Sequence, residues 1–142
     1  MEVKHEPFIK HVAHIGIAVR NMEETLPFYI QTLGLQVEHL EILEKEQVLI
    51  AFLSVGNSYL ELLQPTTTTS TIYQFIEKHG EGIHHIALEV EGLSERIIQL
   101  NQAGIPFIDE EPRHGAKEKM VAFIHPKATN GVLVELCESR KI

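Results

Sequence analysis

One short pattern occurs twice in this chain: a histidine that opens a β-branched apolar run. The first copy is His14-Ile15-Gly16-Ile17-Ala18-Val19, and the second is His85-Ile86-Ala87-Leu88-Glu89-Val90. Further on, each copy has a short apolar strand with a central carboxylate, Glu61 in the first copy and Glu135 in the second. A duplicated module with one His and one Glu at matched places can build a single four-ligand metal site between its halves.

The repeat also predicts the architecture of each half. Each histidine-led strand is followed by a helix-like stretch that ends on a glycine, Gly34 or Gly104, and then by three more strands. We therefore expect an α+β fold of two tandem βαβββ modules, at about 8–64 and 82–138, that form a curved mixed sheet around a metal site. The 142 residues and 44% apolar content fit a single domain over 1–142.

Local signals set the expected bounds of the elements. Asn21 is the expected N-cap of a helix that runs to about Leu33. Because proline removes a backbone donor, we expect either a kink at Pro27 or a later true start of the helix. Ser94 is the expected N-cap of a helix that runs to Ala103. The other expected elements are a helix at 72–79 and strands at 12–19, 36–43, 48–55, 59–63, 83–90, 107–109, 121–124 and 132–136.

Charge and cysteine content exclude several functional classes. A net charge of −8 argues against nucleic acid or an anionic membrane surface as a partner. No apolar run approaches the ~20 residues that span a bilayer, and no signal peptide is visible at the start. The single cysteine, Cys137, rules out an intrachain disulfide and fits a reducing compartment, so we expect a cytoplasmic protein.

The paired His and Glu residues favour a metal site over structural roles. A lone histidine on a strand is more often a hydrogen-bonded structural residue, but a glutamate inside an apolar strand is costly unless it is paired or coordinated. Of the adjacent His84 and His85, the repeat register selects His85, and strand alternation points His84 the other way. We predict one divalent ion per chain (Co, Mn, Ni or Zn) with the ligands His14, Glu61, His85 and Glu135.

From His11 to Glu138 the chain resembles the vicinal oxygen chelate superfamily, and within it the methylmalonyl-CoA epimerase family. The first strand is common to the superfamily, whereas the combination of the later segments is specific. The segments that carry the resemblance are Val12–Val19, Leu26-Pro27-Phe28-Tyr29, Leu33-Gly34-Leu35, Tyr59–Pro65, Gly80–Ala87, Asp109-Glu110-Glu111-Pro112-Arg113, His125-Pro126-Lys127 and Gly131–Leu136.

The resemblance implies an activity as well as the same four metal ligands. The family epimerises the α-carbon of methylmalonyl-CoA through an enolate that the metal stabilises. Inversion removes a proton on one face and returns one on the other, so two acid/base groups are needed. Glu135 is the expected first group, and the second is left open among Glu61, Glu46 and a metal-held water, with Glu46 most simply a solvated loop charge. The family commonly forms dimers, so we expect a homodimer.

The chain departs from the family pattern where a second base could stand. Residues 44–47 lack the proline and glycine that many relatives have in this loop, and residues 49–51 are apolar where some epimerases have an acidic residue. These differences concern the second base and the pocket, and they leave the four metal ligands intact.

Basic residues in module two are candidates for binding the acyl-CoA substrate. Arg113 and Lys127 are the expected contacts to the CoA phosphates. Ordinary solvated loop charges are the alternative interpretation. The whole basic group is Arg113, Lys117, Lys119 and Lys127.

Three other functions compete with epimerisation. A glyoxalase I-type lyase, which acts on a glutathione hemithioacetal, uses the same four-ligand geometry. An Fe(II) extradiol dioxygenase needs only two His and one carboxylate, so a fourth ligand at Glu61 counts against it. A binding protein of the drug-resistance type needs no metal, and the retention of all four ligand positions counts against that reading.

Overall fold

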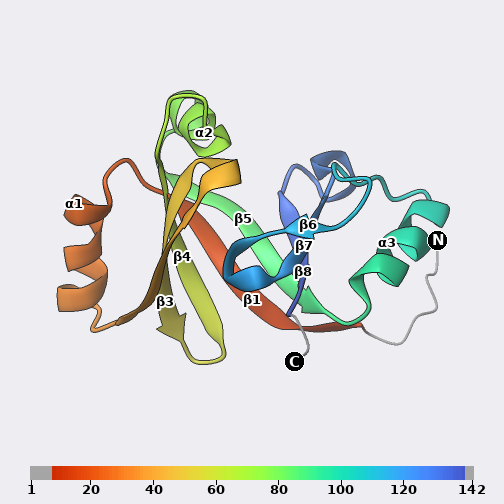
Figure 1. The fold of residues 1–142 in the computed structure, drawn as a ribbon, viewed down its shortest axis with the longest axis horizontal. Helices are drawn as coiled ribbons and strands as arrows, with labels where there is room; N and C mark the ends of the chain where they lie inside the picture. Colours follow the sequence, from red (N-terminus) through yellow and green to blue (C-terminus); the bar gives the residue numbers. More distant parts are fainter. Residues whose placement is uncertain (1–7, 140–142) are drawn as a thin grey trace. The chain divides into compact units, whose positions relative to one another are not determined.

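The computed structural model describes residues 8–139, drawn as a ribbon in Figure 1. The chain divides into two compact units: one is His14–His85, and the other joins the residues before 14 to those from 86 onward. Strands β1 (Ile9–Ala18) and β5 (Gly82–Val90) each contribute residues to both units. None of the helices within 8–139 has the length and apolar character needed to cross a bilayer.

The 14–85 unit holds a mixed sheet in the strand order β2-β3-β4-β1-β5. Strands β2, β3 and β4 are antiparallel neighbours, whereas β1 runs parallel to β4 and places Gly16 opposite Glu61. The further elements of this unit are α1 (Met22–Pro27), the π-helical turn η1 (Phe28–Thr32), β2 (Val37–Leu43), the 3-10 turn η2 (Glu44–Glu46), β3 (Val48–Val55), β4 (Ser58–Pro65) and α2 (Thr71–His79).

Helix α1 covers one face of this sheet, beside β3 and β4 in Figure 1. The predicted cap is confirmed, because the Asn21 side chain accepts a hydrogen bond from the Glu24 amide at 3.0 Å. The predicted single helix to Leu33 is wrong in its winding: α1 ends at Pro27, which lacks an N–H, and the chain continues as a π-helical turn. Met22 anchors α1 in a core with Val19, Ala51, Leu53 and Leu62.

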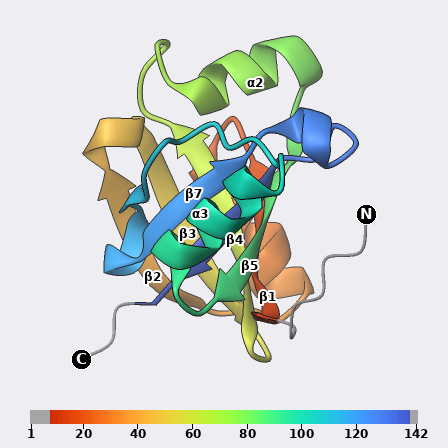
Figure 2. The same ribbon diagram turned by 90° about the vertical axis from the view of Figure 1, so that its right-hand side faces the viewer.

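The second unit holds the strand order β1-β5-β8-β7-β6. Strand β5 runs parallel to β8, and Ala87 is the register partner of Glu135. Figure 2 shows α3 lying across β7, and its apolar side packs on Val90, Ala122 and Leu136. The elements are α3 (Leu93–Gln102), β6 (Arg113–His114), the 3-10 turn η3 (Ala116–Glu118), β7 (Met120–Ile124), the 3-10 turn η4 (Pro126–Ala128) and β8 (Val134–Glu138). The α+β class with two βαβββ repeats is confirmed.

Two local predictions in this unit are wrong. Ser94 lies inside α3, which begins at Leu93, and the amides of Gly92 and Leu93 donate to the Glu138 carboxylate at 2.7 and 3.0 Å. A carboxylate from β8 therefore caps the helix in place of a local serine.

The expected strand at 107–109 is reduced to a single bridge between Phe107 and Ile124. The Asp109 side chain accepts a hydrogen bond from the Phe123 amide at 2.7 Å. This amide is therefore not available to a backbone carbonyl, as a longer pairing of strands would require. The strand that pairs regularly with β7 at this edge is instead the two-residue β6.

Candidate metal centre

Two buried imidazoles face each other across β1 and β5. The Nε2 atoms of His14 and His85 lie 2.9 Å apart, and the two rings are nearly perpendicular, with an interplanar angle of 86°. Gly16 shares the face of β1 with His14, and a Cβ atom at this position would overlap the His85 ring. The small residue that the repeat places after His14 is thus what makes room for His85.

Glu61 contacts His14 at the ring nitrogen Nδ1. Its strand β4 runs parallel to β1, and Glu61 Oε2 accepts a hydrogen bond from His14 Nδ1 at 2.7 Å. Both side chains are 8% exposed, so the carboxylate is buried and is paired with the ring nitrogen opposite the one that faces His85. A carboxylate at Nδ1 fixes the imidazole tautomer that leaves the Nε2 lone pair available to a cation.

Glu135 lies in the second unit, on β8, and is buried. Its register partners are Ala87 on β5 and Phe123 on β7. Ala87 lies two residues after His85 on β5, so these two side chains point to the same face of the strand. The register pairs Glu135 with Ala87. Like His14 and His85, Glu135 offers a buried ligand atom suited to a metal ion.

His84 was expected to point away from the site, but its ring turns back toward His85. The two Nδ1 atoms are 2.9 Å apart, and the His84 ring also packs edge-on against Phe75 of α2. Burial lowers the pKa of His84 to about 4. Burial, followed by the nearby charges of His14 and His84, holds the pKa of His85 well below its usual 6.5. Both rings are therefore neutral near pH 7, the form in which an imidazole binds a metal.

The basic residues expected to meet CoA have different surroundings. Arg113 is half exposed, forms an ion pair with Asp109 at 3.4 Å and lies over the Phe123 ring. Lys127 is exposed on η4, and its backbone amide donates to the His125 ring. Lys119, in contrast, reaches inward to the buried Glu89 at 3.4 Å.

Sequence reasoning assigned no role to Glu89, although it sits in an apolar strand as Glu61 does. It is buried, and its carboxylate accepts from the Ser139 amide at 2.9 Å and from the Ser139 hydroxyl at 3.2 Å. The Cys137 thiol, also buried, lies 3.8 Å from the same carboxylate. The signal in the sequence was the alternation His85-Ala87-Glu89, which marks Glu89 as inward-facing.

The donor set fits a divalent metal ion. Ligand nitrogens lie about 2.0–2.1 Å from Zn²⁺, so two of them 2.9 Å apart can share one ion at roughly a right angle. Neutral imidazole nitrogens and carboxylate oxygens suit Zn, Co, Ni or Mn.

Comparisons with known proteins identify relatives of this chain. The sequence profile of the Glyoxalase/Bleomycin resistance protein/Dioxygenase superfamily matches residues 13–123. The uncharacterized protein YqjC of Bacillus subtilis is 46% identical over 127 residues, 89% of this chain and 91% of that protein. Mitochondrial methylmalonyl-CoA epimerase of Homo sapiens is 39% identical over 124 residues, 87% of this chain and 70% of that protein. A solved methylmalonyl-CoA epimerase in complex with methylmalonyl-CoA and NH4+ has a TM-score of 0.89 and 35% identity, covering 94% of this chain and 97% of that chain.

Proposed function

We propose that this chain, which belongs to the glyoxalase/bleomycin resistance protein/dioxygenase superfamily, is a metal-dependent epimerase that inverts the α-carbon of methylmalonyl-CoA. The chain has the glyoxalase-like fold and is an enzyme of the methylmalonyl-CoA epimerase type, in the isomerase class. The observation that carries the proposed site is the pair of buried imidazoles whose Nε2 atoms face each other at 2.9 Å.

The proposed ligands are His14, Glu61, His85 and Glu135. The burial of all four side chains and the neutral state of His85 support this set. A bound divalent ion supplies Lewis-acid stabilisation of the negative charge that develops on a substrate oxygen. Which of the four suitable metals the protein uses in the cell is set by supply as well as by these donors.

Proton transfer is the task of the carboxylates. The α-carbon of methylmalonyl-CoA lies between a carboxylate and a thioester carbonyl, and the thioester carbonyl acidifies its proton. We assign proton removal or return on one face to Glu135, a buried carboxylate on β8. The second acid/base group, which acts on the opposite face of the α-carbon, stays open among Glu61, Glu46 and a metal-held water. Glu61 is hydrogen-bonded to His14, and Glu46 lies on the 3-10 turn η2.

The CoA part of the substrate needs cations. We propose that Arg113 and Lys127 meet its phosphates, because both reach the surface of the second unit. Lys119 is the weaker candidate of the basic group, since its ammonium already pairs with Glu89. The homodimer and the cytoplasmic location stay predictions.

Deuterium wash-in tests the proposed reaction. Protein stripped with a chelator and reloaded with one equivalent of Co²⁺ is incubated with methylmalonyl-CoA in D₂O, and α-deuterium is followed by NMR. The parent should exchange the α-proton only when reloaded. Glu135→Gln should lose about 10²–10⁴-fold in exchange rate at saturating Co²⁺, the contribution typical of an acid/base group.

Glu77→Gln makes the same chemical change at an exposed position of α2 and should behave like the parent. The protein should leave the methylglyoxal–glutathione adduct unchanged. Turnover of that adduct without exchange on methylmalonyl-CoA would contradict the proposed reaction and favour a lyase.

A further inference from the structure

Each of the two facing imidazoles has a partner at its outer ring nitrogen. For His14 this partner is the Glu61 carboxylate, 2.7 Å from Nδ1. For His85 it is another imidazole: His84 Nδ1 lies 2.9 Å from His85 Nδ1. All of these residues belong to the 14–85 unit. The two histidines are thus supported by chemically different groups, and the second of these groups has no role in the proposed chemistry.

The tautomers of His85 and His84 follow from the number of protons that each neutral ring carries. A neutral imidazole carries one N–H, and the nitrogen that binds a metal must offer its lone pair. If Nε2 of His85 is the ligand atom, its proton sits on Nδ1 and is donated to His84. His84 Nδ1 must then accept, so the single proton of His84 sits on its own Nε2.

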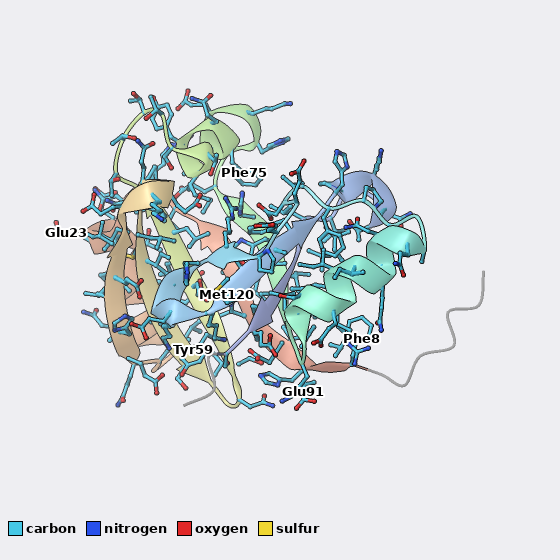
Figure 3. All side chains as sticks on the ribbon, turned by 45° about the vertical axis from the view of Figure 1, so that its right-hand side comes forward. Phe8, Glu23, Tyr59, Phe75, Glu91 and Met120 are labelled. Atoms are coloured by element: carbon cyan, nitrogen blue, oxygen red, sulfur yellow. The ribbon has the colours of Figure 1, made fainter. Side chains whose placement is uncertain are left out.

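The His84 ring is held where it can accept this hydrogen bond. Neighbouring residues on a strand point to opposite faces, so a ring that reaches back to the next residue needs external support. Phe75 on α2 supplies it: the Phe75 and His84 ring centroids are 5.0 Å apart with an interplanar angle of 86°. The His84 and His85 rings are themselves perpendicular, at 90°. Figure 3 marks Phe75 on α2.

We infer that His84 is a positioning residue for the metal: its Nδ1 accepts the His85 Nδ1 proton and so fixes the tautomer and orientation in which His85 Nε2 can bind the ion. The inference rests on the proposed metal site and deepens it. Partners that fix the far nitrogen of a ligand histidine are typically worth 10–100-fold in metal affinity.

A matched pair of substitutions at His84 tests the hydrogen bond. The Oδ1 of asparagine can occupy the place of a histidine Nδ1 and accept the same proton, whereas leucine has nearly the same shape as asparagine and accepts nothing. Both variants lose the ring contact with Phe75 equally. The measurement is the dissociation constant for Co²⁺, by chelator competition, together with the visible spectrum of bound Co²⁺.

His84→Leu should weaken Co²⁺ binding by about 10–100-fold, and His84→Asn should stay within about threefold of the parent. In addition, ¹⁵N NMR of the Zn²⁺-loaded parent should place the proton of His85 on Nδ1 and that of His84 on Nε2. Equal affinity of His84→Leu and the parent would overturn the inference, as would equal losses in both variants or a proton on His84 Nδ1. A parent that binds no Co²⁺ would overturn the proposed metal site as well, which separates the two failures.

Discussion

The two repeats place a small residue two positions after the histidine, but Gly16 and Ala87 have different surroundings. A Cβ atom at Gly16 would overlap the His85 ring, whereas the methyl group of Ala87 is buried in a cluster with Ala13, Val121 and Cys137. The groups behind the two histidines differ as well, a carboxylate at His14 and an imidazole at His85. The duplication therefore keeps the positions of the ligands and diverges in what packs around each one.

Exchanging the two small residues is the strongest test of this difference. Gly16→Ala forces the His85 ring to move, so we expect a loss of about 1–3 kcal/mol in the free energy of unfolding from overpacking. Co²⁺ affinity should fall by more than the 10–100-fold typical of a lost outer partner, because a ligand itself is displaced. Chelator competition and denaturant unfolding measure the two effects.

Ala87→Gly is the control for that exchange. It removes one buried methyl group and should cost about 1 kcal/mol of stability with Co²⁺ affinity unchanged. If both substitutions weaken Co²⁺ binding alike, the close approach of Gly16 to the His85 ring does not explain the loss.

The carboxylate behind His14 should matter more than the imidazole behind His85. Glu61 is a proposed ligand as well as the hydrogen-bond partner of His14, whereas His84 only supports His85, so Glu61→Leu should weaken Co²⁺ binding more than His84→Leu does. Glu61→Gln keeps an oxygen that can accept from His14 Nδ1 and should lose less than Glu61→Leu. Isothermal titration with Co²⁺ gives the order directly. An equal loss in the leucine variants at 61 and 84 would mean that Glu61 acts only as a hydrogen-bond partner of His14 and is not a ligand.

The helices of the two repeats are capped by different means, which gives a smaller effect on stability. Asn21 caps α1 from the adjacent position, whereas Glu138 reaches α3 from β8. Glu138→Ala leaves two amides without their acceptor, so we expect a loss of about 1–2 kcal/mol in the free energy of unfolding. Ser94→Ala should change it by less than about 0.5 kcal/mol. Urea unfolding of the two variants decides between them, and a larger loss in Ser94→Ala would restore serine as the cap.

This capping difference also shows how far the sequence could predict the structure. Periodicity located β1, β3, α2 and β5 closely, and a glutamate inside an apolar strand marked Glu61 and Glu135 as buried. These features depend on neighbours along the chain. The cap from Glu138 joins segments 45 to 46 residues apart. The return of the His84 ring depends on packing against Phe75 of the preceding helix, which the alternation of the His84 strand does not encode.

The hairpin turns of the two repeats give the smallest predicted effect. Between β3 and β4 the turn places Gly56 at a φ of +59°, where glycine is unstrained. Between β6 and β7, the hairpin that matches β2–β3 of the first repeat, the turn places Lys117 and Glu118 at φ of +55° and +58°, where side chains are disfavoured. Asn-Gly is the pair that two successive positive φ values favour.

Replacing Lys117 and Glu118 by Asn and Gly should therefore raise the free energy of unfolding by about 1 kcal/mol, because the strain of the turn is removed. Asn57→Asp in the unstrained turn is the comparison and should leave the free energy of unfolding within about 0.5 kcal/mol of the parent. Thermal unfolding followed by circular dichroism reports both changes. A double variant that melts below the parent would mean that the Lys117 and Glu118 side chains stabilise the turn by more than its backbone strain costs.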